Sequence, residues 1–170
     1  MSEAVAPFEA GADEFSPFVQ REGNEYVLRS RIRLPHAREK VFPFFAEARN
    51  LEQITPSTVK FEVLTPDPIE MRVDARIEYK LKIKMFPVHW RTRITVWNPP
   101  ESFEDVQEKG PYKQWIHQHV FLDEGETTLM DDIVRYRVPL GRIMNYLMVQ
   151  RDVLGIFRYR EQAIRKIFCT

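Results

Sequence analysis

The chain has few of the residues that mark the commonest specialised sites. Its 170 residues include one cysteine, Cys169, so no internal disulfide can form, and this fits a reducing cytoplasmic setting. Its six glycines form no phosphate-binding loop, and no Gly-x-Ser-x-Gly nucleophile motif is present. The sequence therefore gives no sign of a nucleotide phosphate loop or of a hydrolase serine.

Charge and hydropathy exclude further classes. The 25 basic and 25 acidic residues cancel, so no overall field attracts nucleic acid or an anionic membrane. No apolar stretch approaches the ~18 residues that span a bilayer. The first residues also lack the basic start and apolar run of a secretory signal. We expect a cytoplasmic protein with no nucleic-acid partner and no integral membrane association.

The length suits one domain that buries roughly 70% of the surface its unfolded chain exposes. Residues 1–22 mix alanine, glycine, proline and acidic residues with scattered phenylalanines, and we expect a flexible N-terminal tail there. Residues 23–170 are expected to form the single folded domain.

The strongest positive signal is an alternation between Met71 and Met85, where every second residue is apolar and the residues between are charged. This period of two predicts a long strand with one buried face. Because such a strand is unusually long, it must curl, bulge or bend. Phe86-Pro87 is expected as the hairpin turn, and Val88–Trp97 as the returning strand.

The other patterns predict strands, two short helices and one long helix. The expected segments are strand Tyr26–Leu34, helix His36–Ala48 divided at Pro43, a further turn at Leu51–Ile54, strands Lys60–Leu64, Ser102–Glu108, Lys113–Leu122 and Thr127–Val138, and helix Arg142–Phe168. This order predicts an α+β fold, in which a curved antiparallel sheet of about six to seven strands wraps around the C-terminal helix.

The element order, the opening Leu34–Phe42 (LPHAREKVF) and the block Trp115–Gly141 (WIHQHVFLDEGETTLMDDIVRYRVPLG) resemble the SRPBCC superfamily. That superfamily includes START lipid-transfer domains, birch-pollen-allergen-like proteins, polyketide cyclase/dehydrases and coenzyme Q-binding proteins. The chain is most similar to its bacterial cyclase/dehydrase-like members of unassigned function. The resemblance implies a helix-grip ligand-binding domain at residues 23–170, with a hydrophobic cavity between sheet and helix. It implies no particular reaction, because the superfamily contains carriers, receptors and enzymes.

Polar residues interrupt the apolar face of the last hairpin. If a loop at residues 123–126 closes it, His117 lies opposite Asp132 at about 5 Å, with His119 diagonal to the pair and Asp131 facing solvent. Three interpretations stay open. The three residues satisfy one another as a buried polar network, they hold a polar group of an apolar ligand, or His117 acts as a general acid or base oriented by Asp132.

No metal or cofactor is predicted. Two histidines two residues apart on a strand can chelate zinc, but no cysteine or further nearby histidine completes a set of four ligands. Other candidates for lining a pocket are aromatic or polar residues that fall on the inner face, although simple core packing explains each of them as well. They are Tyr79, Trp90, Thr92, Trp115, Tyr136, Tyr146 and Phe157.

The outer face of the long hairpin is basic. Pairing Met85 with Val88 places Lys82 opposite Arg91 and Lys80 opposite Arg93, and like charges so placed repel. This face is interpreted either as a docking patch for an acidic or anionic partner, or as a solvated face that glutamates of the next strand neutralise.

The sequence favours a binding or carrier protein for a hydrophobic small molecule, such as a lipid, an isoprenoid or a polyketide-like compound, held between the sheet and the C-terminal helix. One alternative is a cyclase or dehydratase that uses His117 or His119 with Asp132. Another is a regulatory or interaction module whose cavity is vestigial.

Overall fold

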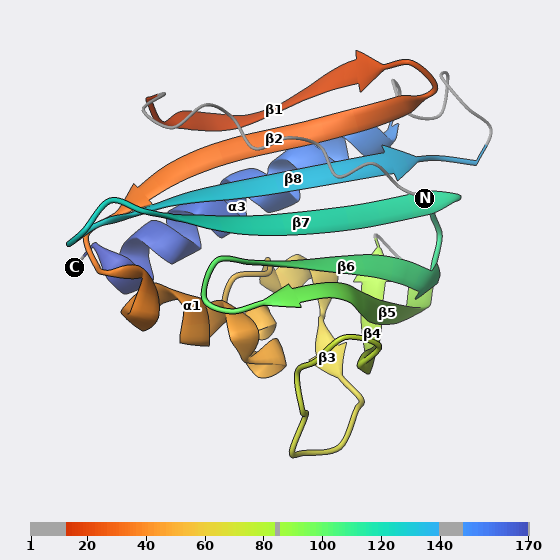
Figure 1. Ribbon diagram of the computed structural model, residues 1–170. Coiled ribbons are helices and arrows are strands. Elements are labelled where there is room, and N and C mark those ends of the chain that lie inside the picture. Colours follow the sequence, from red (N-terminus) through yellow and green to blue (C-terminus); the bar gives the residue numbers. More distant parts are fainter. Residues whose placement is uncertain (1–12, 84–85, 140–147, 170) are drawn as a thin grey trace.

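One antiparallel sheet of eight strands dominates the computed structural model, which describes residues 13–83, 86–139 and 148–169 (Figure 1). In spatial order the strands are β1-β2-β8-β7-β6-β5-β4-β3. Their bounds are β1 Phe15–Glu22, β2 Glu25–Leu34, β3 Glu62–Val63, β4 Arg76–Ile83, β5 Phe86–Asn98, β6 Ser102–Lys109, β7 Gln114–Asp123 and β8 Thr128–Arg137.

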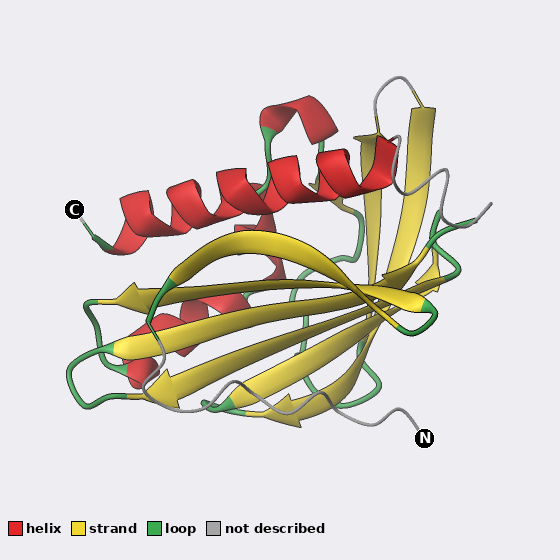
Figure 2. Ribbon diagram, turned by 90° about the horizontal axis from the view of Figure 1, so that it is seen from above, coloured by secondary structure: helices red, strands yellow, loops and turns green. Residues whose placement is uncertain are grey.

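Helix α3 (Gln150–Phe168) lies across the inner face of this sheet, and Figure 2 shows the sheet curling around it. Helix α1 (Arg38–Ala46) and two short 3₁₀ turns, Ala48–Glu52 and Ser57–Val59, follow β2. The pairing of β5 with β6 is interrupted between Arg91 and Thr92, and again between Ile94 and Val96. Such irregularities bend a strand, so they help the sheet to close around the helix. Among the described residues, no helix combines the length and the apolar character that crossing a bilayer requires.

The predicted α+β helix-grip architecture is confirmed, and the buried face of the predicted long strand is confirmed over β4. Ile77, Tyr79 and Leu81 are buried, whereas the charged residues between them are more exposed. The strand is shorter than predicted, because Asp74 has a left-handed backbone (φ 65°) and the segment Met71–Ala75 turns before β4 begins. Phe86 and Pro87 were wrongly assigned to the turn, since they begin β5 and pair with Ile83 and Lys82.

Two other predictions about local structure were wrong. The segment Phe15–Glu22, expected within the tail, pairs with β2 as the edge strand β1. Pro43 does not divide its helix, because α1 runs through it for three further residues to Ala46. The predicted start of the last helix at Arg142 lies outside the described residues.

Candidate functional site

A cavity of about 210 Å³ lies between the sheet, the α1 region and α3. Most of its lining is aliphatic or aromatic. Strand β4 contributes Ile77, Tyr79 and Leu81, and α3 contributes Val153, Ile156 and Phe157. The alternation of β4 and the period of α3 both direct apolar side chains inward, and the cavity is the volume that they leave unfilled. The part of the lining that β4 and α3 contribute is therefore mainly apolar, as the periods of these two elements require.

Aromatic rings close the cavity on one side. The ring centroids of Trp90 and Trp115 are 5.6 Å apart with the planes at 90°, and Tyr112 lies 4.7 Å from Trp115 and 5.7 Å from Trp90. Edge-to-face arrangements of this kind stabilise aromatic clusters beyond their buried area. These three rings come from β5, β7 and the segment before β7, so they connect two strands that lie on either side of β6 in the sheet.

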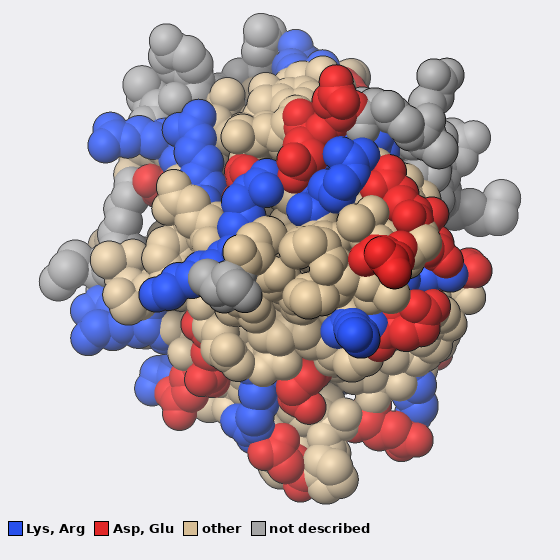
Figure 3. All heavy atoms as spheres, turned by 90° about the vertical axis from the view of Figure 1, so that its left-hand side faces the viewer, with Lys and Arg blue, Asp and Glu red and all other residues tan. Residues whose placement is uncertain are grey.

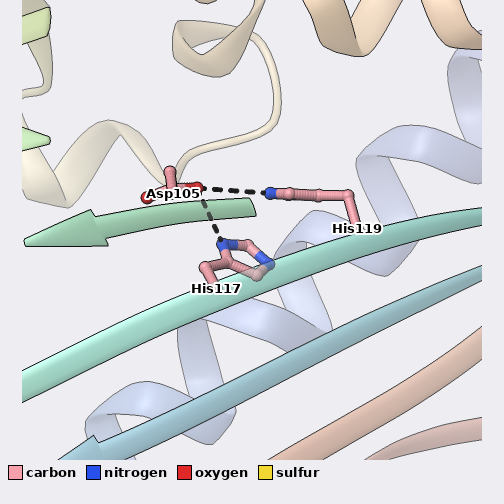
Figure 4. Close-up of side chains that lie close together, drawn as sticks. All are labelled: Asp105, His117 and His119. Atoms are coloured by element: carbon pink, nitrogen blue, oxygen red, sulfur yellow. Dashed lines mark ion pairs between the residues drawn. The ribbon is translucent and has the colours of Figure 1, made fainter. Parts of the chain in front are cut away.

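Six polar side chains cross the inner face from β5 to α3. We call them the polar row, and they are Thr92, Asp105, His117, His119, Asp132 and Arg160. The Thr92 hydroxyl donates to Asp105 Oδ1 at 3.2 Å. Asp105 Oδ2 lies 3.5 Å from His119 Nε2 and 3.9 Å from His117 Nδ1 (Figure 4). Every member is buried or nearly so, and all except Asp132 line the cavity.

Asp132 contacts three other members of this row. Its Oδ1 lies 2.9 Å from His117 Nε2 and 3.0 Å from His119 Nδ1, and Arg160 Nε donates to its Oδ2 at 2.8 Å. Burial alone raises the pKa of the Asp132 carboxyl, but Arg160 and the two histidines hold it well below its usual range. Asp132 is therefore a buried carboxylate that orients both rings.

His117 is neutral at physiological pH. Burial, reinforced by the neighbouring His119 ring, lowers its pKa to about 4 despite the carboxylates near it. Burial also raises the pKa of the Tyr79 phenol, and the charge of Asp105 adds to that effect. The cavity therefore presents the uncharged His117 ring beside one partly exposed carboxylate, Asp105.

Seven of the ten predicted pocket residues line the cavity: Tyr79, Trp90, Thr92, Trp115, His117, His119 and Phe157. Asp132 lies behind the two histidines. Tyr136 is fully buried in the core with Leu28 and Val134 and is not part of the cavity lining, although its ring lies 5.9 Å from that of Trp115. Tyr146 lies outside the described residues.

The predicted register of the last hairpin was wrong by two residues. His119, not His117, lies directly opposite Asp132, and His117 lies opposite Val134. A shift of two keeps every side chain on its face, so both histidines still reach Asp132. Asp131 was wrongly expected in solvent. It is fully buried opposite Arg31, which donates to its two carboxylate oxygens at 2.6 and 2.8 Å.

Sequence reasoning missed Asp105 and Arg160, although both carry a signal. Asp105 is two residues from Phe103 in β6, so it shares the inner face. Arg160 follows the buried Val153 and Phe157 and precedes Ile164 at spacings of four, three and four, which places it on the apolar stripe of α3.

The basic outer face of the long hairpin is largely neutralised. Lys82 lies opposite Pro87 and Lys80 opposite His89, so the predicted lysine–arginine pairs do not form. Arg91 binds Glu78 at 2.6 Å, and Arg93 binds Glu108 at 3.1 Å. On the left-hand side of the molecule in Figure 1, which Figure 3 shows face on, charges of both signs are interspersed. The neutralised face is the interpretation that these ion pairs favour.

Comparison with solved structures places this architecture among known folds. The chain superposes on the major latex-like protein 151 of Panax ginseng with a TM-score of 0.64 at 12% identity, covering 87% of this chain and 100% of that one. This chain has the helix-grip fold. A START superfamily protein of Mycobacterium smegmatis gives 0.64 at 10% identity, covering 84% of this chain and 96% of that one. The Zhui aromatase/cyclase of Streptomyces sp. R1128 gives 0.60 at 12% identity with the same two coverages.

These structural neighbours share the architecture of this chain, so the fold that the sequence resemblance implied is confirmed. No family model matches the chain, and no curated protein matches it in sequence. The neighbours include an aromatase/cyclase, and at these identities the likeness establishes architecture alone.

Proposed function

We propose that this protein binds a hydrophobic small molecule in the cavity between the sheet and α3. The observation that carries the proposal is a void of about 210 Å³ with a mainly apolar lining, which a domain of this size has no structural need to leave empty. A cavity of about 150 Å³ already holds benzene. The volume therefore suits a guest of one or two rings, or a short branched chain.

The polar row supports binding of a guest that carries one polar group. Asp105, His117 and His119 contribute polar atoms to the lining, while the residues that β4 and α1 contribute are mainly apolar. Pockets that combine an apolar body with a few convergent polar groups bind amphiphilic molecules in one orientation. A carbonyl or hydroxyl of the guest lies toward the histidines, and its hydrocarbon part lies toward Ile77 and Leu81.

Native mass spectrometry of the full chain, purified without organic additives, tests the proposal directly. A copurified apolar molecule of defined mass in one-to-one ratio supports it. A fluorescent apolar probe of naphthalene size supplies the second readout, with one saturable site expected per chain. An empty spectrum together with an absence of saturable probe binding contradicts the proposal.

Two variants separate the cavity from the surface. Ala48 is buried and lines the cavity, so Ala48→Leu fills part of it and should weaken probe binding at least tenfold. Phe86 is an exposed aromatic side chain outside the cavity, so Phe86→Ser should leave binding unchanged. The reverse pattern would place the probe on the surface and refute the cavity as its site.

A second function, acid–base catalysis, is favoured by one specific observation: both histidines line the cavity while Asp132 orients them from behind. In a dehydration, His117 Nδ1 takes a proton from the carbon next to a carbonyl, a carbon–carbon double bond forms, and the β-hydroxyl accepts the proton and leaves as water. The guest that copurifies with the wild-type chain should then be lighter, by the mass of one water, than the guest that copurifies with His117→Ala. The His117→Ala variant should still bind the guest but should not dehydrate it.

A further inference from the structure

Three ligand atoms of the polar row converge on one point at the cavity wall. Asp105 on β6 lies directly opposite His117 on β7, and His119 follows two residues later on the same face. One ligand atom from each of these three residues lies within 4.8 Å of the other two. The ring nitrogens paired with Asp105 Oδ2 are His117 Nδ1 and His119 Nε2. Figure 4 shows both rings turned toward this one carboxylate.

The position of Asp132 decides which ring nitrogens carry protons. His117 Nε2 is 2.9 Å from Asp132 Oδ1, and His119 Nδ1 is 3.0 Å from the same oxygen. Arg160 Nη2 also approaches His119 Nδ1, but at the longer distance of 3.5 Å. Two lone pairs at the shorter distances to Asp132 repel, so in the neutral rings each of these nitrogens carries the proton. The opposite nitrogens, His117 Nδ1 and His119 Nε2, are then left with lone pairs that face Asp105.

Three electron-pair donors thus face one another with no hydrogen-bond donor among them. The Thr92 hydroxyl occupies Asp105 Oδ1, which leaves Oδ2 for the centre of the group. The row as a whole holds two carboxylates and one guanidinium, so it has one negative charge in excess when the rings are neutral. Both features favour a cation at the point of convergence.

We propose that Asp105, His117 and His119 bind a divalent transition-metal ion of the Zn²⁺ class. Imidazole nitrogen with carboxylate oxygen is a ligand set for zinc and its first-row neighbours, whereas Ca²⁺ and Mg²⁺ prefer oxygen alone. Three protein ligands leave at least one position open. That position faces the cavity, where water or an oxygen atom of a guest completes the coordination.

The distances from Asp105 to the two histidines need to shorten only slightly to fit this ion. Zinc bonds of about 2.0–2.1 Å in a tetrahedral site place neighbouring ligand atoms about 3.3 Å apart. The observed separations from Asp105 Oδ2 are 3.5 Å to His119 and 3.9 Å to His117, so these two sides of the triangle need to contract by well under 1 Å. The third side, between the two rings, lies within 4.8 Å. The contacts of both rings with Asp132, which Arg160 holds at 2.8 Å, supply the outer hydrogen bonds that orient metal-binding histidines.

This inference goes beyond the proposed function and is independent of it. A metal ion can bind with the cavity empty, and an apolar guest can bind without a metal. Metal binding also competes with the acid–base role of His117, since both use Nδ1.

Titration of the full chain with Co²⁺ alone, after treatment with EDTA, tests the proposal. The exposed Cys169 is replaced by serine throughout, because a thiol could bind the ion elsewhere. We expect one Co²⁺ per chain, visible d–d absorption bands of a low-coordinate nitrogen and oxygen site, and displacement by one equivalent of Zn²⁺. An absence of binding at millimolar Co²⁺ and Zn²⁺ overturns the proposal.

Matched variants locate the ion. Asp105→Asn preserves shape and removes the charge, so it should weaken Co²⁺ binding at least tenfold. His89→Gln is the control, because His89 forms its own pair with Glu78 at 3.0 Å on the outer face and should have no effect. Loss of binding in His89→Gln with none in Asp105→Asn refutes the site.

A measurement on the unchanged ligands covers the case in which Asp105→Asn fails to fold. In ¹⁵N spectra of the histidine rings, Zn²⁺ should shift Nδ1 of His117 and Nε2 of His119 and leave His36 and His89 unmoved. Shifts confined to His36 or His89 contradict the proposal. Probe binding in EDTA is recorded on the same samples, so loss of the metal site and loss of the apolar guest are distinguished.

Discussion

Replacing Arg160 with methionine should cost the protein a large part of its stability. The Arg160 and Asp132 side chains are both 6% exposed, and the Nε–Oδ2 distance is 2.8 Å. Methionine keeps an apolar stem between Phe45 and Phe157, which lie 5.8 and 5.9 Å from the guanidinium carbon, but it leaves Asp132 without a charged partner. Removing one member of a buried ion pair costs about 3–5 kcal/mol, because the remaining charge stays buried.

Urea unfolding followed by far-UV circular dichroism measures this loss. With a slope of about 2 kcal/mol per molar urea, the midpoint should fall by roughly 1.5–2.5 M. Arg165→Met is the matched control on the same helix. The Arg165 side chain is 36% exposed where it pairs with Glu14 and Glu161, and such pairs contribute about 1 kcal/mol or less.

The double variant Arg160→Met/Asp132→Asn separates charge from packing. It removes both charges, so it should recover part of the stability that Arg160→Met loses. A loss below about 1 kcal/mol in Arg160→Met, or an equal loss in Arg165→Met, would show that Asp132 is solvated or satisfied by other groups. The electrostatic account of the polar row would then be wrong.

Three further predictions follow from the described contacts. The buried Tyr79 phenol has a raised pKa, so the folded chain keeps a proton that the unfolded chain loses, and stability should fall as pH rises above about 10 by up to ~1.4 kcal/mol per unit. Tyr79→Phe should lose less stability between pH 9 and 11 than wild type, and equal losses in urea titrations would show that the phenol ionises freely. Trp90 and Trp115 line the cavity while Trp97 packs outside it, so an apolar quencher should reduce tryptophan emission equally well in Trp97→Phe. Quenching that disappears in Trp97→Phe would place the quencher elsewhere. Gly125 in the β7–β8 loop has φ 81°, so Gly125→Ala should lower stability by about 1 kcal/mol in thermal unfolding, and an unchanged midpoint would contradict the strain expected at that position.

The architecture was predictable because the periodic signals are long. The alternation through β4 and the apolar stripe of α3 each extend over several residues, so single interruptions do not hide them. The edge strand β1 was not predictable in the same way. Phe15 and Phe18 are spaced by three residues, and the pairing of β1 with β2 is irregular between them, so no clean alternation marks the strand.

The histidines of the site were predictable, but their partners were only partly so. Parity placed His117, His119 and Asp132 on one face, and a register error of two residues preserved that result. Asp105 and Arg160 are charged residues on buried faces, where burial is unusual unless a partner is present. Only the tertiary arrangement supplies those partners, because strand pairing brings β6, β7 and β8 together and α3 lies across their inner face.

The ion pair between Arg31 and Asp131 shows the same limit on the opposite face. Alternation in β8 assigned Asp131 to the solvent side, yet both side chains of the pair are fully buried. A period of two distinguishes the two faces of a strand, but it does not say whether one face or both are covered. The one indication of burial was that pairing β2 with β8 places Arg31 opposite Asp131, a residue of opposite charge.

The cavity is the central claim, and xenon tests it most directly. Xenon enters dry apolar cavities and scatters X-rays strongly. In crystals of the full chain pressurised with xenon, we predict anomalous density between β4, α1 and α3, within contact distance of Ile77, Leu81 and Phe157. Side chains that fill this space, or ordered waters that occupy it in place of xenon, would contradict the account.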